Sequence, residues 1–266
     1  MFTKIKATLA GPVLEVKQYQ HAIEYGISKN ITQTNCYGRK NSETKDSSRN
    51  ISNFRTKRRI RQLVYANAYK YRDARGRAYQ PIFATFTFKD SMPDPKSANP
   101  LFTAFLKRLN YQLTGSKKAT LKYITIVEFQ KDVDFYGNIK PNGGSVHYHT
   151  VFFNLPFITG DVQKFFRYIW SYGFSKVNGV NNLQHLANYI AKYLTKSDRD
   201  KRLDNKKYFF SSKGLYQPKE IYQRSAILKL LDTLPADIEK SEMEYKTYKG
   251  EKILYTRFKL PDGLII

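Results

Sequence analysis

Two of the chain's four histidines lie in the stretch Ser145-Val146-His147-Tyr148-His149-Thr150-Val151-Phe152-Phe153-Asn154. The stretch is rich in β-branched and aromatic residues, which predicts a strand. Residues i and i+2 of a strand point to the same face, so His147 and His149 present two imidazoles side by side while Tyr148 points the other way. Two imidazoles on one face make a good pair of metal ligands. The alternative is a strand whose two histidines serve only hydrogen bonding.

A carboxylate precedes this strand at a suitable place. Residues 121–130 predict a second strand, and Glu128 and Gln130 share one of its faces. The connection 131–144 is rich in Gly and Asn, which predicts a hairpin that sets the two strands next to each other. If their faces coincide, His147, His149 and Glu128 hold one divalent ion, with Gln130 as a lesser, neutral candidate. Mixed nitrogen and oxygen ligation with open positions suits Mn or Mg with phosphate, and Zn is an alternative.

A predicted helix at about 182–196 carries two tyrosines, each followed by a lysine three residues on. Its second half reads Tyr189-Ile190-Ala191-Lys192-Tyr193-Leu194-Thr195-Lys196. The two tyrosines are one helical turn apart, at the edge of the arc of apolar residues that buries the helix. A tyrosine hydroxyl is a credible nucleophile when a metal polarises phosphorus and a cation such as Lys192 or Lys196 steadies the phenolate. The alternative is a pair of tyrosines that only pack.

The order of predicted elements indicates the fold. A strand at 81–89 is followed by a helix from Asn99-Pro100 to Leu113, the strand 121–130, the histidine strand, a helix at about 161–171 and a strand at 173–180. This β-α-β-β-α-β order predicts an α+β, ferredoxin-like core with an antiparallel sheet, two helices on one face and the other face open for a site. The tyrosine helix is an extra element. We expect a basic N-terminal extension at 1–78, the core at 79–213 and a C-terminal extension at 214–266.

The charge indicates the class of partner. The 266 residues include 46 Lys and Arg against 22 Asp and Glu, a net charge of +24, which favours nucleic acid, and an anionic membrane less. There is no apolar run near the roughly 20 residues that cross a membrane. The N-terminus lacks the apolar core of a secretory signal, and the single cysteine, Cys36, suits a reducing cytoplasm. We therefore expect a cytoplasmic protein without a membrane partner.

One basic cluster stands out near the N-terminus. It precedes an apolar stripe at helical spacing (residues 63–69), and it consists of Arg55, Lys57, Arg58, Arg59 and Arg61. We expect a helix that contacts DNA phosphates, and the alternative is a solvated surface helix. Residues 31–53 are polar and predict a loop or linker.

Three segments together resemble the motifs of rolling-circle replication initiators in the HUH endonuclease superfamily, where U is a bulky hydrophobic residue. They are Phe83-Ala84-Thr85-Phe86-Thr87-Phe88, His147-Tyr148-His149 with its apolar strand, and the tyrosine helix segment 189–196. The likeness is greatest to initiators of small bacterial phages and plasmids. Mobilisation relaxases place their tyrosine before the HUH motif, whereas here it follows. Tyr148 is bulky but amphipathic for the U position.

The resemblance implies an activity. It implies that His147, His149 and Glu128 hold a divalent metal, and that a tyrosine cuts single-stranded origin DNA to leave a 5′-phosphotyrosine and a free 3′-OH. The chain has no G-x-x-x-x-G-K-[ST] phosphate loop, so we expect it to nick and rejoin DNA and to depend on a host helicase and polymerase. The alternatives are a tyrosine transposase of the same superfamily and a nucleic-acid-binding module without catalysis, whose sheet stacks bases.

Overall fold

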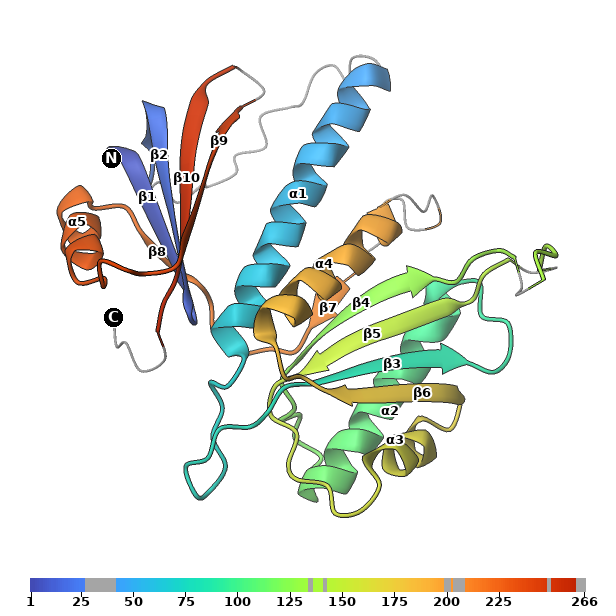
Figure 1. Ribbon diagram of the computed structural model, residues 1–266. Helices are drawn as coiled ribbons and strands as arrows, with labels where there is room; N and C mark the ends of the chain where they lie inside the picture. The colour runs from blue at the N-terminus through green and yellow to red at the C-terminus, as the bar shows by residue number, and fades with distance from the viewer. Residues whose placement is uncertain are drawn as a thin grey trace. The chain divides into compact units, whose positions relative to one another are not determined.

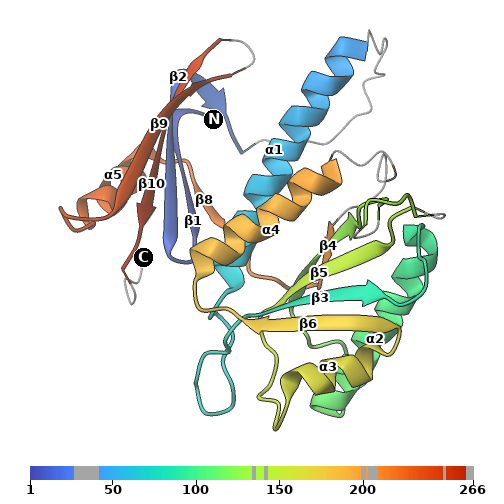
Figure 2. The ribbon, with the colours of Figure 1, turned by 45° about the vertical axis from the view of Figure 1, so that its right-hand side comes forward.

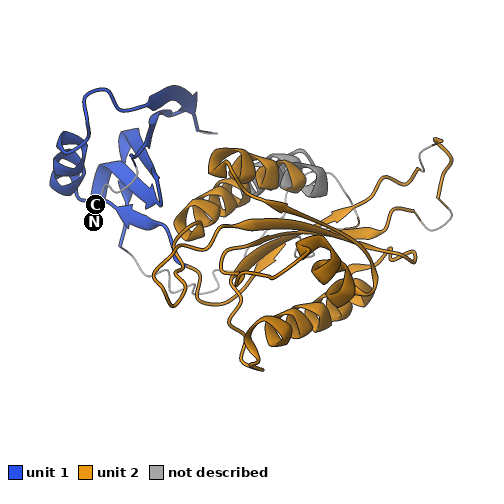
Figure 3. Cartoon of the chain, turned by 60° about the horizontal axis from the view of Figure 1, so that its bottom comes forward, with its two compact units in different colours: residues 1–52, 216–266 blue, residues 53–215 orange. Residues whose placement is uncertain are grey.

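The computed structural model describes residues 1–26, 42–133, 136–140, 143–198, 202, 209–247 and 250–261, and only the backbone of 42–54 and 194–198. The chain forms two compact units, shown in Figure 3. Unit 1 combines residues 1–52 with 216–266, and unit 2 comprises residues 53–215.

Unit 2 contains the predicted core. Its elements are β3 (Ile82–Phe88), α2 (Pro95–Thr114), β4 (Tyr123–Phe129), β5 (Val146–Phe152), α3 (Val162–Trp170), β6 (Gly173–Gly179), α4 (Leu183–Asp198) and β7 (Phe209–Ser211). The sheet has the order β6-β3-β5-β4-β7, and every pair is antiparallel. The α+β fold, the β-α-β-β-α-β order and the extra helix are thus confirmed. The prediction of a loop from Arg199 to Lys213 was wrong at residues 209–211, because this segment pairs with β4 as an edge strand.

The two faces of this sheet differ because side chains alternate along each strand. On one face, Phe86 packs among aromatic residues of α2 and α3, with ring centroids 4.6 Å from Phe105 and 5.2 Å from Trp170. Each such fully buried ring contributes about 1.5–3 kcal/mol. Tyr148 belongs to this face, as predicted, and its hydroxyl donates to Oδ1 of Asn99 at 2.7 Å. Both ribbon views show α4 on the opposite face (Figures 1 and 2).

Helix α2 begins earlier than the sequence indicated. The prediction placed its start at Asn99-Pro100, but Asp94 is the N-cap and Pro95 the first helical residue. Asp94-Pro95 offers the same cap-then-proline signal as Asn99-Pro100, so the local pattern alone did not choose between them. The helix ends as predicted at Gly115, which takes φ 66°.

Helix α1 (Ser42–Asn67) contains the basic cluster, as predicted. The prediction of a loop or linker at 31–53 was wrong for residues 42–53, and its remainder lies outside the described residues. No glycine or proline interrupts 42–67, so the helix extends backward from the buried stripe around Ile60 and Val64. The stripe ends with the helix, because Tyr69 lies in the following turn with φ 57°.

Unit 1 joins the two ends of the chain in a second sheet. Its elements are β1 (Phe2–Ala10), β2 (Val13–Glu24), β8 (Lys219–Ile221), α5 (Arg224–Asp232), β9 (Lys240–Lys246) and β10 (Lys252–Lys259), with the strand order β8-β1-β2-β10-β9. Ile227 and Leu230 of α5 pack against Ala7, Leu14 and Val16 on one face. The segments expected as two separate extensions therefore share one hydrophobic core.

Candidate active site

The register of β4 and β5 brings the predicted carboxylate to the predicted imidazoles. Glu128 lies opposite His147, and its neighbour Ile126 lies opposite His149. Oε2 of Glu128 is 2.7 Å from Nε2 of His149, and the two residues are only 8% and 4% exposed. A buried carboxylate and imidazole in contact form a strong, charge-assisted hydrogen bond.

The other ring nitrogen of His149 is held by a residue that the sequence reasoning missed. Thr85 lies opposite His149 on β3, and its Oγ1 is 3.1 Å from Nδ1. When Glu128 is ionised, Nε2 carries the proton and Nδ1 accepts from the threonine hydroxyl. The two contacts fix the tautomer and the orientation of the ring. Alternation along 82–88 places Thr85 on the open face and was the signal that could have found it.

His147 completes the set of potential metal ligands. Its ring centroid is 6.2 Å from that of His149, and its Nε2 is buried. Two imidazoles and one carboxylate suit a divalent ion chemically. As arranged, however, no three His, Cys, Asp or Glu side chains among the described residues form a group that could hold an ion. The contact between His149 and Glu128 would have to open. Gln130 is engaged elsewhere, because its Oε1 accepts from Nζ of Lys140 at 3.3 Å.

The tyrosines of α4 lie over the histidine strand. The ring of Tyr193 stacks on His149, with centroids 3.6 Å apart and planes 19° apart. Its hydroxyl donates to the hydroxyl of Tyr189. Phe83 of β3 contacts Tyr189 edge-on at 5.3 Å. Burial, then the hydrogen bond and the charge of Tyr189, and then the Glu128 carboxylate raise the pKa of Tyr193. The hydroxyl of Tyr193 therefore keeps its proton at neutral pH in this arrangement.

The structure describes only one of the two predicted lysines in full. Lys192 is exposed and lines, together with Tyr189, a pocket of about 660 Å³. Lys196 is on α4, but its side chain lies outside the described residues.

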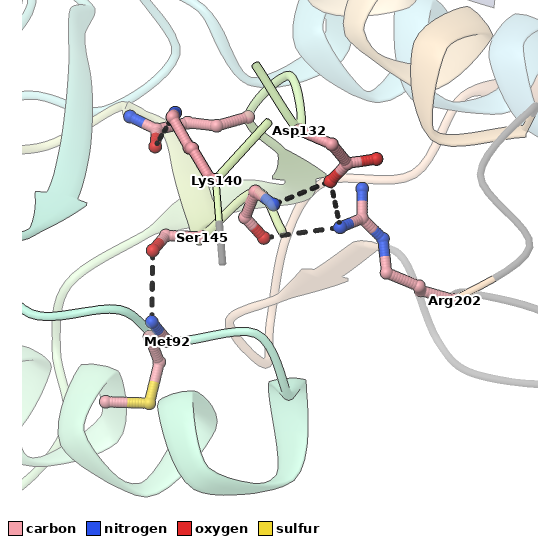
Figure 4. A network of polar contacts seen from close by, with 7 residues as sticks. Met92, Asp132, Lys140, Ser145 and Arg202 are labelled. Atoms are coloured by element: carbon pink, nitrogen blue, oxygen red, sulfur yellow. Dashed lines mark hydrogen bonds and ion pairs between the residues drawn. The ribbon is translucent and has the colours of Figure 1, made fainter. Parts of the chain in front are cut away.

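A polar network fixes the connection between β4 and β5 beside His147 (Figure 4). Asp132 accepts from the backbone N–H of Gly144 at 2.6 Å and from Nη1 of Arg202 at 2.8 Å. The guanidinium of Arg202 also lies 4.0 Å from the ring centroid of Phe129. A Cβ at Gly144 would come within 1.9 Å of the carbonyl oxygen of Gln130, so only glycine fits there. Nothing local in the sequence pairs Arg202 with Asp132, and both were missed.

The positive charge is concentrated in unit 2. Unit 2 carries 29 Lys and Arg against 10 Asp and Glu, whereas unit 1 carries 17 against 12. Within the predicted basic cluster on α1, the two exposed side chains are Arg55 and Arg59, and the partly buried ones are Lys57, Arg58 and Arg61. None of the helices in the described residues is long and apolar enough to cross a membrane.

Comparison with known proteins gives one match. Residues 81–198 match the model of a family of replication-associated proteins, the ORF2 type. The matched segment runs from β3 to the end of α4, and so contains Glu128, both strand histidines and both tyrosines. This confirms the resemblance to rolling-circle replication initiators and supports a role in starting DNA replication. No curated protein and no solved structure matches the chain.

Proposed function

We propose that this protein is an HUH-type endonuclease and strand transferase that starts rolling-circle replication by nicking single-stranded origin DNA. The contact between Tyr193 and His149 carries the proposal, because it sets a hydroxyl nucleophile beside a potential metal ligand. The family match to replication-associated proteins supports the same role.

The reaction needs one nucleophile and one leaving group. The phenolate oxygen of Tyr189 or Tyr193 attacks the scissile phosphorus, and the bond from phosphorus to the 3′ oxygen breaks. The 3′ oxygen takes up a proton and leaves as a 3′-OH, while the 5′ phosphate stays on the tyrosine as an ester. Rejoining reverses these steps, because a 3′-OH attacks the ester and the tyrosine recovers its proton. The free 3′-OH primes synthesis.

The proposed metal ligands are His147, His149 and Glu128, with Mn or Mg as the ion. The bound ion would act as a Lewis acid on the phosphate oxygens. The chain's own residues then have three tasks. Thr85 orients His149 through Nδ1. Lys192 and Lys196 favour the phenolate over the neutral phenol, which matters because the pKa of Tyr193 is raised in the protein by burial. Sheet and helix together exclude water from the phosphate.

Both tyrosines are proposed as nucleophiles. Their hydroxyls are hydrogen-bonded to each other, so both reach the position of one phosphate. One tyrosine would hold the 5′ end while the other cuts the regenerated origin.

The positive charge of unit 2 would supply affinity for the single-stranded DNA substrate. Since synthesis and unwinding need other enzymes, we propose that a host helicase and polymerase extend the 3′-OH in the cytoplasm of a bacterial host.

Incubation with single-stranded origin DNA of its replicon and Mn²⁺ tests the proposal. A denaturing gel should show a protein–DNA adduct, and a polymerase should extend the released 3′ end. A protein in which both Tyr189 and Tyr193 are replaced by Phe is the control. Binding of the DNA without any adduct would leave a nucleic-acid-binding module instead.

A further inference from the structure

A pocket of about 660 Å³ opens between the end of β6 and the beginning of α4. Its volume is within the range of about 300–1,000 Å³ that is usual for small-molecule sites. The residues of its lining that bear on its chemistry are Phe83, Asn178, Asn188, Tyr189, His185 and Lys192. The pocket therefore lies next to Tyr189, on the side away from the strand that carries His147.

Four asparagines line this pocket, and they fall into two pairs. Asn182 and Asn181 serve the fold. Oδ1 of Asn182 accepts from the backbone N–H of His185 at the start of α4, and Asn181 accepts from Gln80. Asn178 and Asn188 are exposed, and their side chains make no hydrogen bond within the part of the chain that the structure describes. Two amides, each with a donor and an acceptor, are therefore available to a ligand.

The rest of the lining fits a flat, anionic ligand. Phe83 and Tyr189 offer aromatic surface, and Asn178 lies directly across from Phe83 in the sheet. Lys192 and His185 supply cationic or hydrogen-bonding groups, and no Asp or Glu is among the described residues of the lining. Bases of single strands bind through this combination of aromatic stacking, cations for phosphate and side-chain amides on the base edge.

The backbone of the pocket is held in place before any ligand binds. The carbonyl oxygen of Val180, which lines the pocket, accepts from Nε2 of Gln80 at 3.2 Å and from the hydroxyl of Tyr69 at 3.3 Å. Tyr69 adopts φ 57°, a conformation that costs free energy for a residue with a Cβ. A pocket that is already formed loses less entropy when it orders a flexible DNA strand.

We propose that this pocket holds one unstacked base of single-stranded DNA beside the phosphate that reaches Tyr189, and that Asn178 and Asn188 read the edge of that base. The inference rests on the proposed function for the identity of the DNA. It adds a specificity-determining site, which makes the protein select a base next to the cut. The amides of Asn178 and Asn188 choose the base, whereas the aromatic rings and Lys192 accept any nucleotide.

A binding selection without metal tests this site separately from cleavage. The probe is a library of randomised single-stranded DNA, and the bound fraction is sequenced. The wild-type protein is compared with an Asn178→Ala, Asn188→Ala variant. Gln112→Ala is the matched control, because it removes an exposed amide from α2 on the other side of the sheet. Thermal melting of all three proteins establishes that they are folded.

We expect the wild-type protein and Gln112→Ala to prefer one base at one position, by roughly tenfold. The double variant should lose that preference while it still binds the unselected library. Unchanged preferences in the double variant would overturn the proposal, and so would a wild-type protein that selects no base. Since the selection never requires a cut, its failure is distinct from a failure to form the tyrosine adduct.

Discussion

The ring of Tyr193 lies on the imidazole of His149, with centroids 3.6 Å apart. The same imidazole bonds Glu128 through Nε2 and Thr85 through Nδ1. A helix and three strands thus converge on one histidine, and this convergence defines the experiments below.

Removing both strand imidazoles should abolish metal binding. We expect a His147→Ala, His149→Ala protein to show no Mn²⁺ binding by calorimetry and no adduct with single-stranded DNA. Its DNA affinity should remain within about twofold, because phosphate contacts supply most of that affinity. His21→Ala, which changes an exposed histidine in unit 1, is the control. Full nicking by the double variant would refute the metal assignment.

Replacing the tyrosines should show which of them reacts. Tyr189→Phe and Tyr193→Phe should each retain some adduct on a denaturing gel, and the double variant should form none. Phenylalanine removes only the hydroxyl, so the ring contact with His149 and the binding of DNA should persist. If one single variant loses every adduct and the other is unaffected, a single tyrosine is the catalyst. An adduct on the double variant would exclude α4 from the chemistry.

Thr85→Val should weaken metal binding without unfolding the protein. Valine has nearly the same shape but cannot bond Nδ1 of His149, so the ring loses its fixed orientation. Loss of such a partner typically costs about 10- to 100-fold in metal affinity. Calorimetry with Mn²⁺ measures the effect. Thr87→Val, two residues further along the same face of β3, is the control, and an equal loss in both variants would argue against the orienting role.

The basic cluster on α1 should contribute affinity that depends on salt. When Arg55, Lys57, Arg58, Arg59 and Arg61 are replaced by glutamine, the slope of log K against log salt should fall by about 0.7 for each phosphate that the helix no longer neutralises. Fluorescence anisotropy with single-stranded DNA at several salt concentrations measures this slope. The control replaces Lys240, Lys252 and Lys259, which pair with glutamates in unit 1. An unchanged slope would make α1 a solvated surface helix.

Gly144→Ala should destabilise unit 2 beside the histidines. The new Cβ would meet the backbone carbonyl of Gln130 at 1.9 Å, so β5 must shift against β4. We expect a cost on the order of 2 kcal/mol or more in the free energy of unfolding, measured by denaturant titration. Gly179→Ala is the control, because its Cβ would meet only a side-chain atom of Gln80 at 3.8 Å. Equal stability of the two variants would contradict the close approach.

The sequence alone determined the order and type of the elements in the core. Alternation along 82–88, 123–129 and 146–152 and the apolar faces of α2, α3 and α4 are local signals, so they can be read without knowing the partners. The same periodicity put His147 and His149 on one face and Tyr148 on the other. The beginnings of α1 and α2 were misplaced, because cap signals recur and a polar segment without glycine or proline can be helical or not.

Only the tertiary structure decided which residues meet. The register of β4 against β5 put Glu128 on His149 and left Gln130 to Lys140. The pairing of β3 with β5 brought Thr85 to the same ring. The sheet of unit 1 and the contact of Arg202 with Asp132 join segments far apart in the chain. Such contacts depend on the packing of whole elements rather than on the local periodicity of the chain, so no short stretch of sequence encodes them.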